Sequence, residues 1–278
     1  MNKKNFSMDF TVRYHEIDTE WQASPLTLLF YLEDAAIAHS EAVGYDAERM
    51  RSESLAWLLR RWHIQVERYP VCGEKVVVET WPSSFERFYG RREFLIRTPE
   101  GEALCNATSL WIFYSMARKR PCRISPEFGT LYGLNAMRAL EDSFAPLPAF
   151  SEDHGQIGAA SCGLCAGEDA EKAEVRQNGA NTARELTVRY GDIDTNGHVN
   201  NAYYLQWMLE AVPPDFYRSH RLASVEIRYD KETTYGSVIR SQCSIEDADE
   251  LKGAYMHIIR DRDSGQDLAA GRTVWVKK

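Results

Sequence analysis

One nine-residue segment, called the repeated phrase below, occurs twice in the chain. Residues 11–19 read TVRYHEIDT and residues 187–195 read TVRYGDIDT, so that seven of nine letters agree at a separation of 176 positions (187 minus 11). Each copy is followed by a stretch with helical signals and then by four segments rich in β-branched and aromatic residues. The repeat predicts two copies of a unit made of one strand, one helix and four strands. A chain of 278 residues is long enough for each copy to bury its own core.

The helix of the first copy is marked at both ends. Ser24 suits the N-cap, Pro25 suits the first helical position, and Gly44 stands where a C′ glycine belongs, so we expect a helix from Pro25 to Val43. Its interior is apolar on more than one face, which indicates a helix surrounded by other structure. The four strand-like segments that follow are 55–69, 74–81, 85–98 and 103–116, with a hairpin turn at 98–101.

The second copy repeats this order. A helix is expected from Asn200 to Val212, ended by two prolines, and the strand-like segments are 224–232, 237–246, 252–263 and 267–278, with a turn at 263–266. An antiparallel sheet curled around an almost wholly apolar helix resembles the hot-dog fold. We therefore expect an α+β protein with tandem hot-dog domains at 1–120 and 185–278. The segment 121–184 between them is expected to be a linker that holds short helices near its start.

Composition narrows the class of function. A net charge of −8 argues against a nucleic-acid binder, because phosphate neutralisation needs a basic surface. No run of about eighteen apolar residues exists, so no membrane span is expected. The N-terminus lacks the apolar core of a secretory signal, which predicts a cytoplasmic protein.

The six cysteines are expected to be free thiols, because the chain is long and carries no export signal. Cys162 and Cys165 form a CxxC that would fit half a zinc site or a redox pair. A second pair with zinc spacing is missing, and no strand precedes the motif, so we interpret the pair as incidental to the linker. No cofactor and no metal are expected.

The two copies differ after the shared phrase. Asp194 corresponds to Asp18, but Asn196 falls on Glu20 and His198 falls on Gln22. If 194–198 stays extended, Asp194, Asn196 and His198 lie on one face just before a helix, where they could hold a water and move a proton. Free N–H groups of the helix would favour an oxyanion there. Capping and turn formation would also explain Asp, Asn and Gly. The first copy folds without the Asn and the His, which favours a functional site in the second copy alone.

The stretch DIDTNGHVNNAYYLQWMLEAVP resembles the active-site segment of the acyl-acyl carrier protein thioesterases, in which a D-x-N-x-H-V-N-N motif opens the helix of the second hot-dog domain. The resemblance covers nearly the whole chain. It implies catalytic roles for Asp194, Asn196 and His198, and for Glu232 in the later segment RYDKETTYGSV. Plant members carry a cysteine directly after that glutamate, where this chain has Thr233, so a thiolate mechanism is unavailable there. Whether Asp194 or Glu232 is the base or the nucleophile is left open.

The resemblance also implies the substrate. The chain would hydrolyse fatty acyl-acyl carrier protein, which presents its acyl group on a phosphopantetheine arm, and the residues Val199, Asn200, Asn201, Trp57 and Phe30 would contact substrate. The first domain would hold the acyl chain in a pocket between its helix and sheet, although plain core packing explains most of its aromatic residues equally well. Two other functions stay open: an acyl-coenzyme A thioesterase, and a hot-dog protein that binds acyl groups without cleaving them. The sequence does not decide whether two chains form a homodimer.

An acidic carrier protein would dock on a basic surface. The candidate cations are Arg118, Lys119, Arg120 and Arg123, and also Arg87, Arg91 and Arg92. The alternative is that these side chains are simply solvated, as arginines and lysines at strand ends usually are.

Overall fold

The structure is a computed structural model that describes residues 5–141, 144, 147, 181–248 and 251–278. The chain divides into two compact units, Met1–Ala145 and Pro146–Lys278. Cys162, Cys165 and most of the expected linker fall outside the described residues. Cys72, Cys105, Cys122 and Cys243 are free thiols, as predicted. In the part of the chain that is described, no helix is long and apolar enough to cross a membrane.

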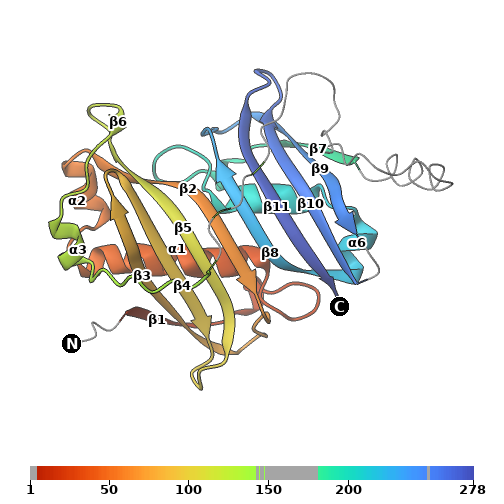
Figure 1. Cartoon of the computed structure of the whole chain (residues 1–278). Helices are drawn as coiled ribbons and strands as arrows, with labels where there is room; N and C mark the ends of the chain where they lie inside the picture. The colour runs from red at the N-terminus through yellow and green to blue at the C-terminus, as the bar shows by residue number, and fades with distance from the viewer. Residues whose placement is uncertain (1–4, 142–143, 145–146, 148–180, 249–250) are drawn as a thin grey trace, which may run out of the picture. The chain divides into compact units, whose positions relative to one another are not determined.

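Unit 1 is an antiparallel sheet with one long helix, α1 (Pro25–Ala42), lying across it (Figure 1). The strand order is β1-β3-β4-β5-β2, and β6 pairs with β5. The strands are β1 (Phe6–Thr11), β2 (Leu55–Val66), β3 (Lys75–Glu86), β4 (Tyr89–Arg97), β5 (Ala103–Ser115) and β6 (Arg120–Pro121). The short helices are a 3₁₀ turn η1 (Tyr14–Glu16), α2 (Ala47–Ser52) and α3 (Glu127–Leu131).

Unit 2 has the same plan around helix α5 (Ala202–Glu210), with strand order β8-β11-β10-β9-β7 (Figure 1). Its strands are β7 (Asn181–Thr187), β8 (His220–Tyr229), β9 (Val238–Ala248), β10 (Lys252–Asp261) and β11 (Asp267–Lys277). Its short helices are η2 (Tyr190–Asp192) and α6 (Pro214–Ser219). The expected hot-dog architecture, a sheet around a central helix, is therefore confirmed in both units.

The end signals of α1 act as the sequence predicts. The Ser24 hydroxyl accepts a hydrogen bond from the Thr27 N–H at 3.1 Å, and Gly44 has φ +82° after the last turn. The side chains of Leu28, Leu29 and Leu32 are at most 1% exposed, as expected of a helix wrapped by a sheet.

Other boundaries were predicted less well. The repeated phrase begins at the end of a strand and continues into the 3₁₀ turns η1 and η2, so most of it is not extended. Residues 85 and 86 belong to β3 and not to the third segment. Helix α5 begins two residues later than expected, and the second of the two prolines opens α6. Helices α2 and α6 were not predicted, because six residues carry almost no periodic signal.

Gly271 on β11 sets how closely α5 approaches its sheet. A Cβ at this position would lie 2.8 Å from the Met208 sulfur of α5 and 2.8 Å from the Glu226 carbonyl oxygen of β8. The Met208 side chain could move aside, but the Glu226 carbonyl belongs to the backbone of β8, so only glycine fits here without shifting the sheet.

Each unit buries a histidine whose pKa lies far below its ordinary value. Burial lowers the pKa of His257 to about 3, and burial together with the charge of Arg92 lowers the pKa of His39 to about 3. Between pH 6.5 and 3 the unfolded chain therefore binds more protons than the folded one, so stability is fully present above pH 6.5 and falls as the pH falls. Each histidine accounts for about 1.4 kcal/mol per pH unit in this window.

His257→Gln is expected to reduce this acid sensitivity. The glutamine amide can still bond Thr273, whose hydroxyl lies 2.8 Å from the His257 Nε2. Urea unfolding at pH 6.5 and pH 5 should show that the variant loses about 2 kcal/mol less than wild type between the two values. The exposed His15→Gln variant should lose as much as wild type. Equal losses in H257Q and wild type would contradict the assignment.

Candidate active site

The residues from Asp194 to His198 form a tight turn. The N–H of Asp194 donates to the His198 carbonyl at 2.7 Å, and the N–H of Gly197 donates to the Asp194 carbonyl at 3.1 Å. Gly197 has φ +82°, which glycine adopts without strain. The Asp194 carboxylate lies inside this turn, where Oδ1 accepts from the N–H groups of Asn196 (2.8 Å) and His198 (3.3 Å).

The first copy builds the same turn with other side chains. Asp18 Oδ1 accepts from the N–H groups of Glu20 (2.8 Å) and Gln22 (3.3 Å), and Asp18 N–H donates to the Gln22 carbonyl at 2.8 Å. Trp21 takes the place of Gly197 with φ +63°. The shared aspartate is therefore explained by the turn in both units, whereas Asn196 and His198 are not required to form it.

Two expectations about this stretch are wrong. The segment 194–198 is not extended, because the aspartate side chain competes for backbone N–H groups and closes a turn. The N–H groups at the start of α5 are not free for an oxyanion either. Ala202 N–H donates to the Asn200 Oδ1 at 2.8 Å, and the N–H groups of Tyr203 and Tyr204 donate to the carbonyls of Asn200 and Asn201.

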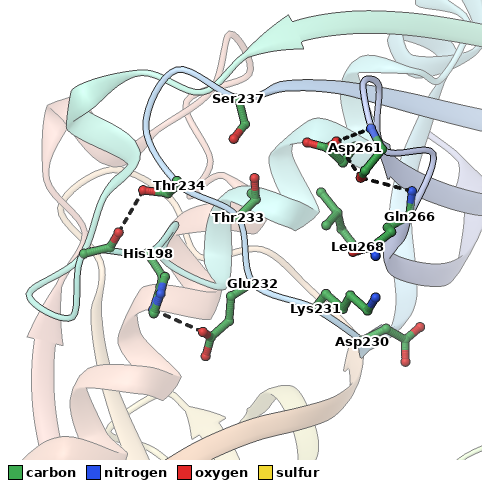
Figure 2. Close-up of a pocket in the computed structure, with 12 residues that line it drawn as sticks. His198, Asp230, Lys231, Glu232, Thr233, Thr234, Ser237, Asp261, Gln266 and Leu268 are labelled. Carbon is green, nitrogen blue, oxygen red and sulfur yellow. Dashed lines mark hydrogen bonds and ion pairs between the residues drawn. The ribbon is translucent and has the colours of Figure 1, made fainter.

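The turn brings His198 to Glu232. The His198 Nδ1 lies 3.3 Å from the Glu232 Oε2, and both side chains are partly exposed, at 41% and 58% (Figure 2). An imidazole beside a carboxylate, both open to water, can take a proton from a bound water and hand it on. Asp194 lies beside this pair in the chain, and its Oδ2 accepts from the Asn196 amide at 3.2 Å.

The segment that carries Glu232 is fixed on both sides. Val199 N–H donates to the Thr233 carbonyl at 3.0 Å, and the Thr234 hydroxyl donates to the Gly197 carbonyl at 3.1 Å. From α5, the Tyr204 hydroxyl donates to the Lys231 carbonyl at 3.4 Å. Burial, with a contribution from the Glu232 charge, raises the pKa of Tyr204, so this hydroxyl stays protonated and able to donate.

A pocket of about 780 Å³ opens beside the pair (Figure 2). Its lining is mostly hydroxyl, amide and charged groups with a single leucine. The lining residues are Gly197, His198, Asp230, Lys231, Glu232, Thr233, Thr234, Ser237, Asp261, Ser264, Gln266 and Leu268. Asp194 and Asn196 are not among them. The pocket of the described residues therefore presents His198 and Glu232 to a ligand.

Unit 1 lacks both groups of this pair. The hydrogen bond from Val199 to Thr233 has its counterpart in one from Ala23 to Pro70, so Glu232, just before Thr233, corresponds to Tyr69. His198 corresponds to Gln22. Tyr69 is 6% exposed. Among the described residues, the His198–Glu232 pair therefore has no counterpart in unit 1.

The residues predicted to contact substrate do not line the pocket. Val199 is buried, the Asn200 side chain caps α5, and the Asn201 carbonyl accepts from the Tyr229 hydroxyl at 3.1 Å. Trp57 packs in an aromatic cluster of unit 1, 4.7 Å between ring centroids from Phe113. Phe30 is half-buried on α1. Their roles in substrate binding stay predictions.

The candidate docking cations fall into two groups. Arg118, Lys119, Arg120 and Arg123 are exposed around the β5–β6 turn, and none of them forms an ion pair with the described residues. Arg87 is exposed, and Arg91 lies over the Phe144 ring. Arg92 is wrongly placed in the prediction. It is only 9% exposed and its Nη1 lies 2.9 Å from the His39 Nδ1, because β4 turns this side chain towards α1.

The polar pocket residues Lys231, Ser237 and Gln266 were missed by sequence reasoning. A fixed separation of 176 aligns the two copies only as far as the central helix, and loop lengths then differ. Among the described residues, no group of three or more His, Cys, Asp or Glu side chains is arranged to hold a metal ion.

Comparison with known proteins identifies the family of the chain. A model of the acyl-ACP thioesterase N-terminal domain matches residues 3–132, and one of the C-terminal domain matches residues 175–277. The palmitoyl-acyl carrier protein thioesterase of Gossypium hirsutum is 30% identical over 98% of this chain and 64% of its own length. The acyl-[acyl-carrier-protein] hydrolase FATB2 of Cuphea viscosissima is 28% identical over 98% and 63%. The chain thus spans less than two thirds of these two relatives.

Solved structures of acyl-ACP thioesterases have the same fold as this chain. The 12:0-ACP thioesterase from Umbellularia californica superposes with a TM-score of 0.79 at 27% identity, over 98% of this chain and 94% of that one. An acyl-ACP thioesterase from Bacteroides thetaiotaomicron, at 19% identity and a TM-score of 0.75, shares the fold. With both domain models matched in order along the sequence, the chain belongs to the acyl-ACP thioesterase family.

Proposed function

We propose that the chain hydrolyses the thioester of fatty acyl-[acyl-carrier-protein] and releases free fatty acid, which ends fatty acid synthesis on that carrier. The observation that carries this proposal is the His198–Glu232 pair at an open pocket in unit 2, with Gln22 and Tyr69 at the same places in unit 1. Family membership supplies the substrate class.

Glu232 acts as the general base. Its carboxylate removes a proton from a water bound on the open side of the His198–Glu232 pair, and the resulting hydroxide adds to the thioester carbonyl carbon. The tetrahedral intermediate then collapses, the carbon–sulfur bond breaks, and the thiol of the carrier arm leaves with the proton that Glu232 had taken. A thiolate is a good leaving group, so no covalent enzyme intermediate is needed.

Asn196 and Asp194 position this chemistry. One amide N–H of Asn196 bonds Asp194, which orients the Asn196 amide within the turn that carries His198. The Asp194 carboxylate is engaged with the backbone of the turn that holds His198. The geometry thus favours Glu232 over Asp194 as the base.

Substitutions of Asp194 test that choice. Asp194→Asn keeps an oxygen that accepts from the turn and should retain kcat within about tenfold, whereas the general base is worth about 100- to 10,000-fold. Asp194→Ala should lose about 1 kcal/mol of stability together with more of the activity. The matched variant Asp18→Ala should lose similar stability and keep its kcat. An Asp194→Asn loss of thousandfold in kcat would make Asp194 the base or nucleophile instead.

The carrier protein docks on the cations of the β5–β6 turn. These side chains are exposed and unpaired within the described residues, and an acidic partner would be attracted to them. Reversing two charges with Arg118→Glu and Lys119→Glu should raise KM for acyl-carrier protein about tenfold. The KM for acyl-coenzyme A, which lacks the acidic protein, should change much less. Equal effects on both substrates would contradict docking at this turn.

The function itself is tested by thiol release. The purified protein is incubated with a series of acyl-carrier proteins and acyl-coenzyme A thioesters, and free fatty acids are profiled in a bacterial host that produces it. Faster release from the carrier protein supports the proposal, and faster release from coenzyme A supports the acyl-coenzyme A alternative. Tight acyl binding without any turnover would favour the non-catalytic acyl-binding protein.

A further inference from the structure

Three pocket residues, Lys231, Ser237 and Gln266, have no role in the reaction proposed above, and they differ from the residues at the matching positions of unit 1. Backbone hydrogen bonds identify the matching positions. Lys231 N–H donates to the Leu268 carbonyl as Arg68 N–H donates to the Leu104 carbonyl, at 3.1 and 3.3 Å. Lys231 in unit 2 therefore occupies the place of Arg68 in unit 1.

Two further positions match in the same way. The Ser237 carbonyl accepts from Val188 N–H, and the Glu74 carbonyl accepts from Val12 N–H. The hairpin bond from Asp261 to the Gln266 carbonyl has its counterpart in the bond from Thr98 to the Glu102 carbonyl. Ser237 thus corresponds to Glu74, and Gln266 corresponds to Glu102.

In unit 1 these three positions form a closed ion-pair cluster. The Arg68 guanidinium bonds Glu74 at 2.7 Å and Glu102 at 2.9 Å. In unit 2 both carboxylates are replaced by neutral groups, and Lys231 forms no ion pair with the described residues. All three unit 2 residues line the pocket (Figure 2).

The carboxylates that face the pocket are engaged elsewhere. Asp230 pairs with Arg228 at 2.9 Å, Asp261 accepts from the Ser264 hydroxyl at 2.7 Å, and Glu232 pairs with His198. Among the described residues, Lys231 therefore has three donors and no paired carboxylate, and it lines the pocket together with the Gln266 amide and the Ser237 hydroxyl.

We propose that Lys231, Ser237 and Gln266 bind the amide-bearing pantetheine arm of the substrate, an inference that rests on the proposed function. The arm has two amide groups beyond its sulfur. The carbonyl oxygen of the second amide would accept from the Lys231 ammonium, and the amide N–H groups need acceptors such as Gln266 and Ser237. Leu268, 3% exposed, offers an apolar contact to its methylene groups. Because Glu232 is the next residue after Lys231, an arm bound here has its thioester end beside the base.

The test varies the length of the arm and the pocket together. Initial rates are measured with an acyl-pantetheine thioester and with the matching acyl-N-acetylcysteamine thioester, which ends after the first amide. Lys231→Gln should raise KM for the pantetheine substrate about tenfold, the worth of one charge-assisted hydrogen bond, and shift the KM of the shorter substrate by less than about twofold. An acyl-phosphopantetheine substrate shows whether the phosphate adds to the effect.

A second variant rebuilds the cluster of unit 1. Ser237→Glu with Gln266→Glu should pair with Lys231, keep or raise the melting temperature, and raise KM for the pantetheine substrate by a similar factor. The matched control is Arg68→Gln in unit 1, which should lower the melting temperature and leave both KM values as in wild type.

The outcomes separate the two proposals. A selective rise in KM for the longer substrate supports an arm site at these residues. Turnover by wild type with equal KM changes on both substrates, or with none, overturns the inference and leaves the proposed function standing. Absence of turnover on every thioester overturns the proposed function and the arm site with it.

Discussion

Glu232→Gln is expected to lower kcat for thioester hydrolysis by about 100- to 10,000-fold, the usual worth of a general base. Glutamine keeps the size of the side chain and can still bond the imidazole, but it cannot take a proton from water. Because Glu232 is 58% exposed and its segment is held through the carbonyls of Lys231 and Thr233, the fold should be unaffected.

The measurement is a steady-state assay with thermal unfolding of the same preparation. The control is Glu246→Gln, which removes another partly exposed carboxylate of unit 2, one paired with Arg272. It should keep the kcat of wild type. A Glu232→Gln protein with kcat within about fivefold of wild type, well short of the loss of a base, would remove Glu232 from the chemistry.

His198→Gln is expected to lower kcat by about 100-fold or more, because an imidazole that orients and exchanges protons with the attacking water is lost. The variant gives unit 2 the residue that unit 1 carries at the same place, Gln22, so the turn should form normally. The hydrogen bonds that close this turn use the backbone and Asp194, and not the imidazole.

The reciprocal variant, Gln22→His, is the control. It should create no second site, because Tyr69 stands where Glu232 would be needed. Single-turnover rates of both variants, with near-wild-type melting temperatures, would locate the effect in unit 2. A His198→Gln protein as fast as wild type would show that Glu232 works without the imidazole.

The architecture could be predicted because its signals are local and doubled. The Ser24-Pro25 start of α1 and the Gly44 after it act over a few residues, and the repeated phrase identifies the second unit. The shape of the 194–198 turn could not be predicted from strand alternation. It depends on whether the Asp194 side chain captures backbone N–H groups, and the same residues would fit an extended strand.

The pocket residues Lys231 and Gln266 could not be predicted from the sequence for another reason. Lys231 and Gln266 are 35 positions apart (266 minus 231) and line the same pocket because β8 and β11 are neighbours. Their counterparts Arg68 and Glu102 became visible only through matching backbone hydrogen bonds. Arg92 was misplaced because the alternation of β4 decides which of two adjacent arginines faces inward, and a run of two cannot show that.

Gly271 does not line the pocket, yet a substitution there should lower activity. Any larger residue would displace the Met208 side chain of α5 and the backbone of β8 at Glu226, and β8 leads directly into the segment that carries Glu232. A genetic screen that scores only fatty acid release would then recover alleles at 271 together with those in the pocket. Such alleles would act by shifting the segment that carries Glu232, and not through a contact with substrate.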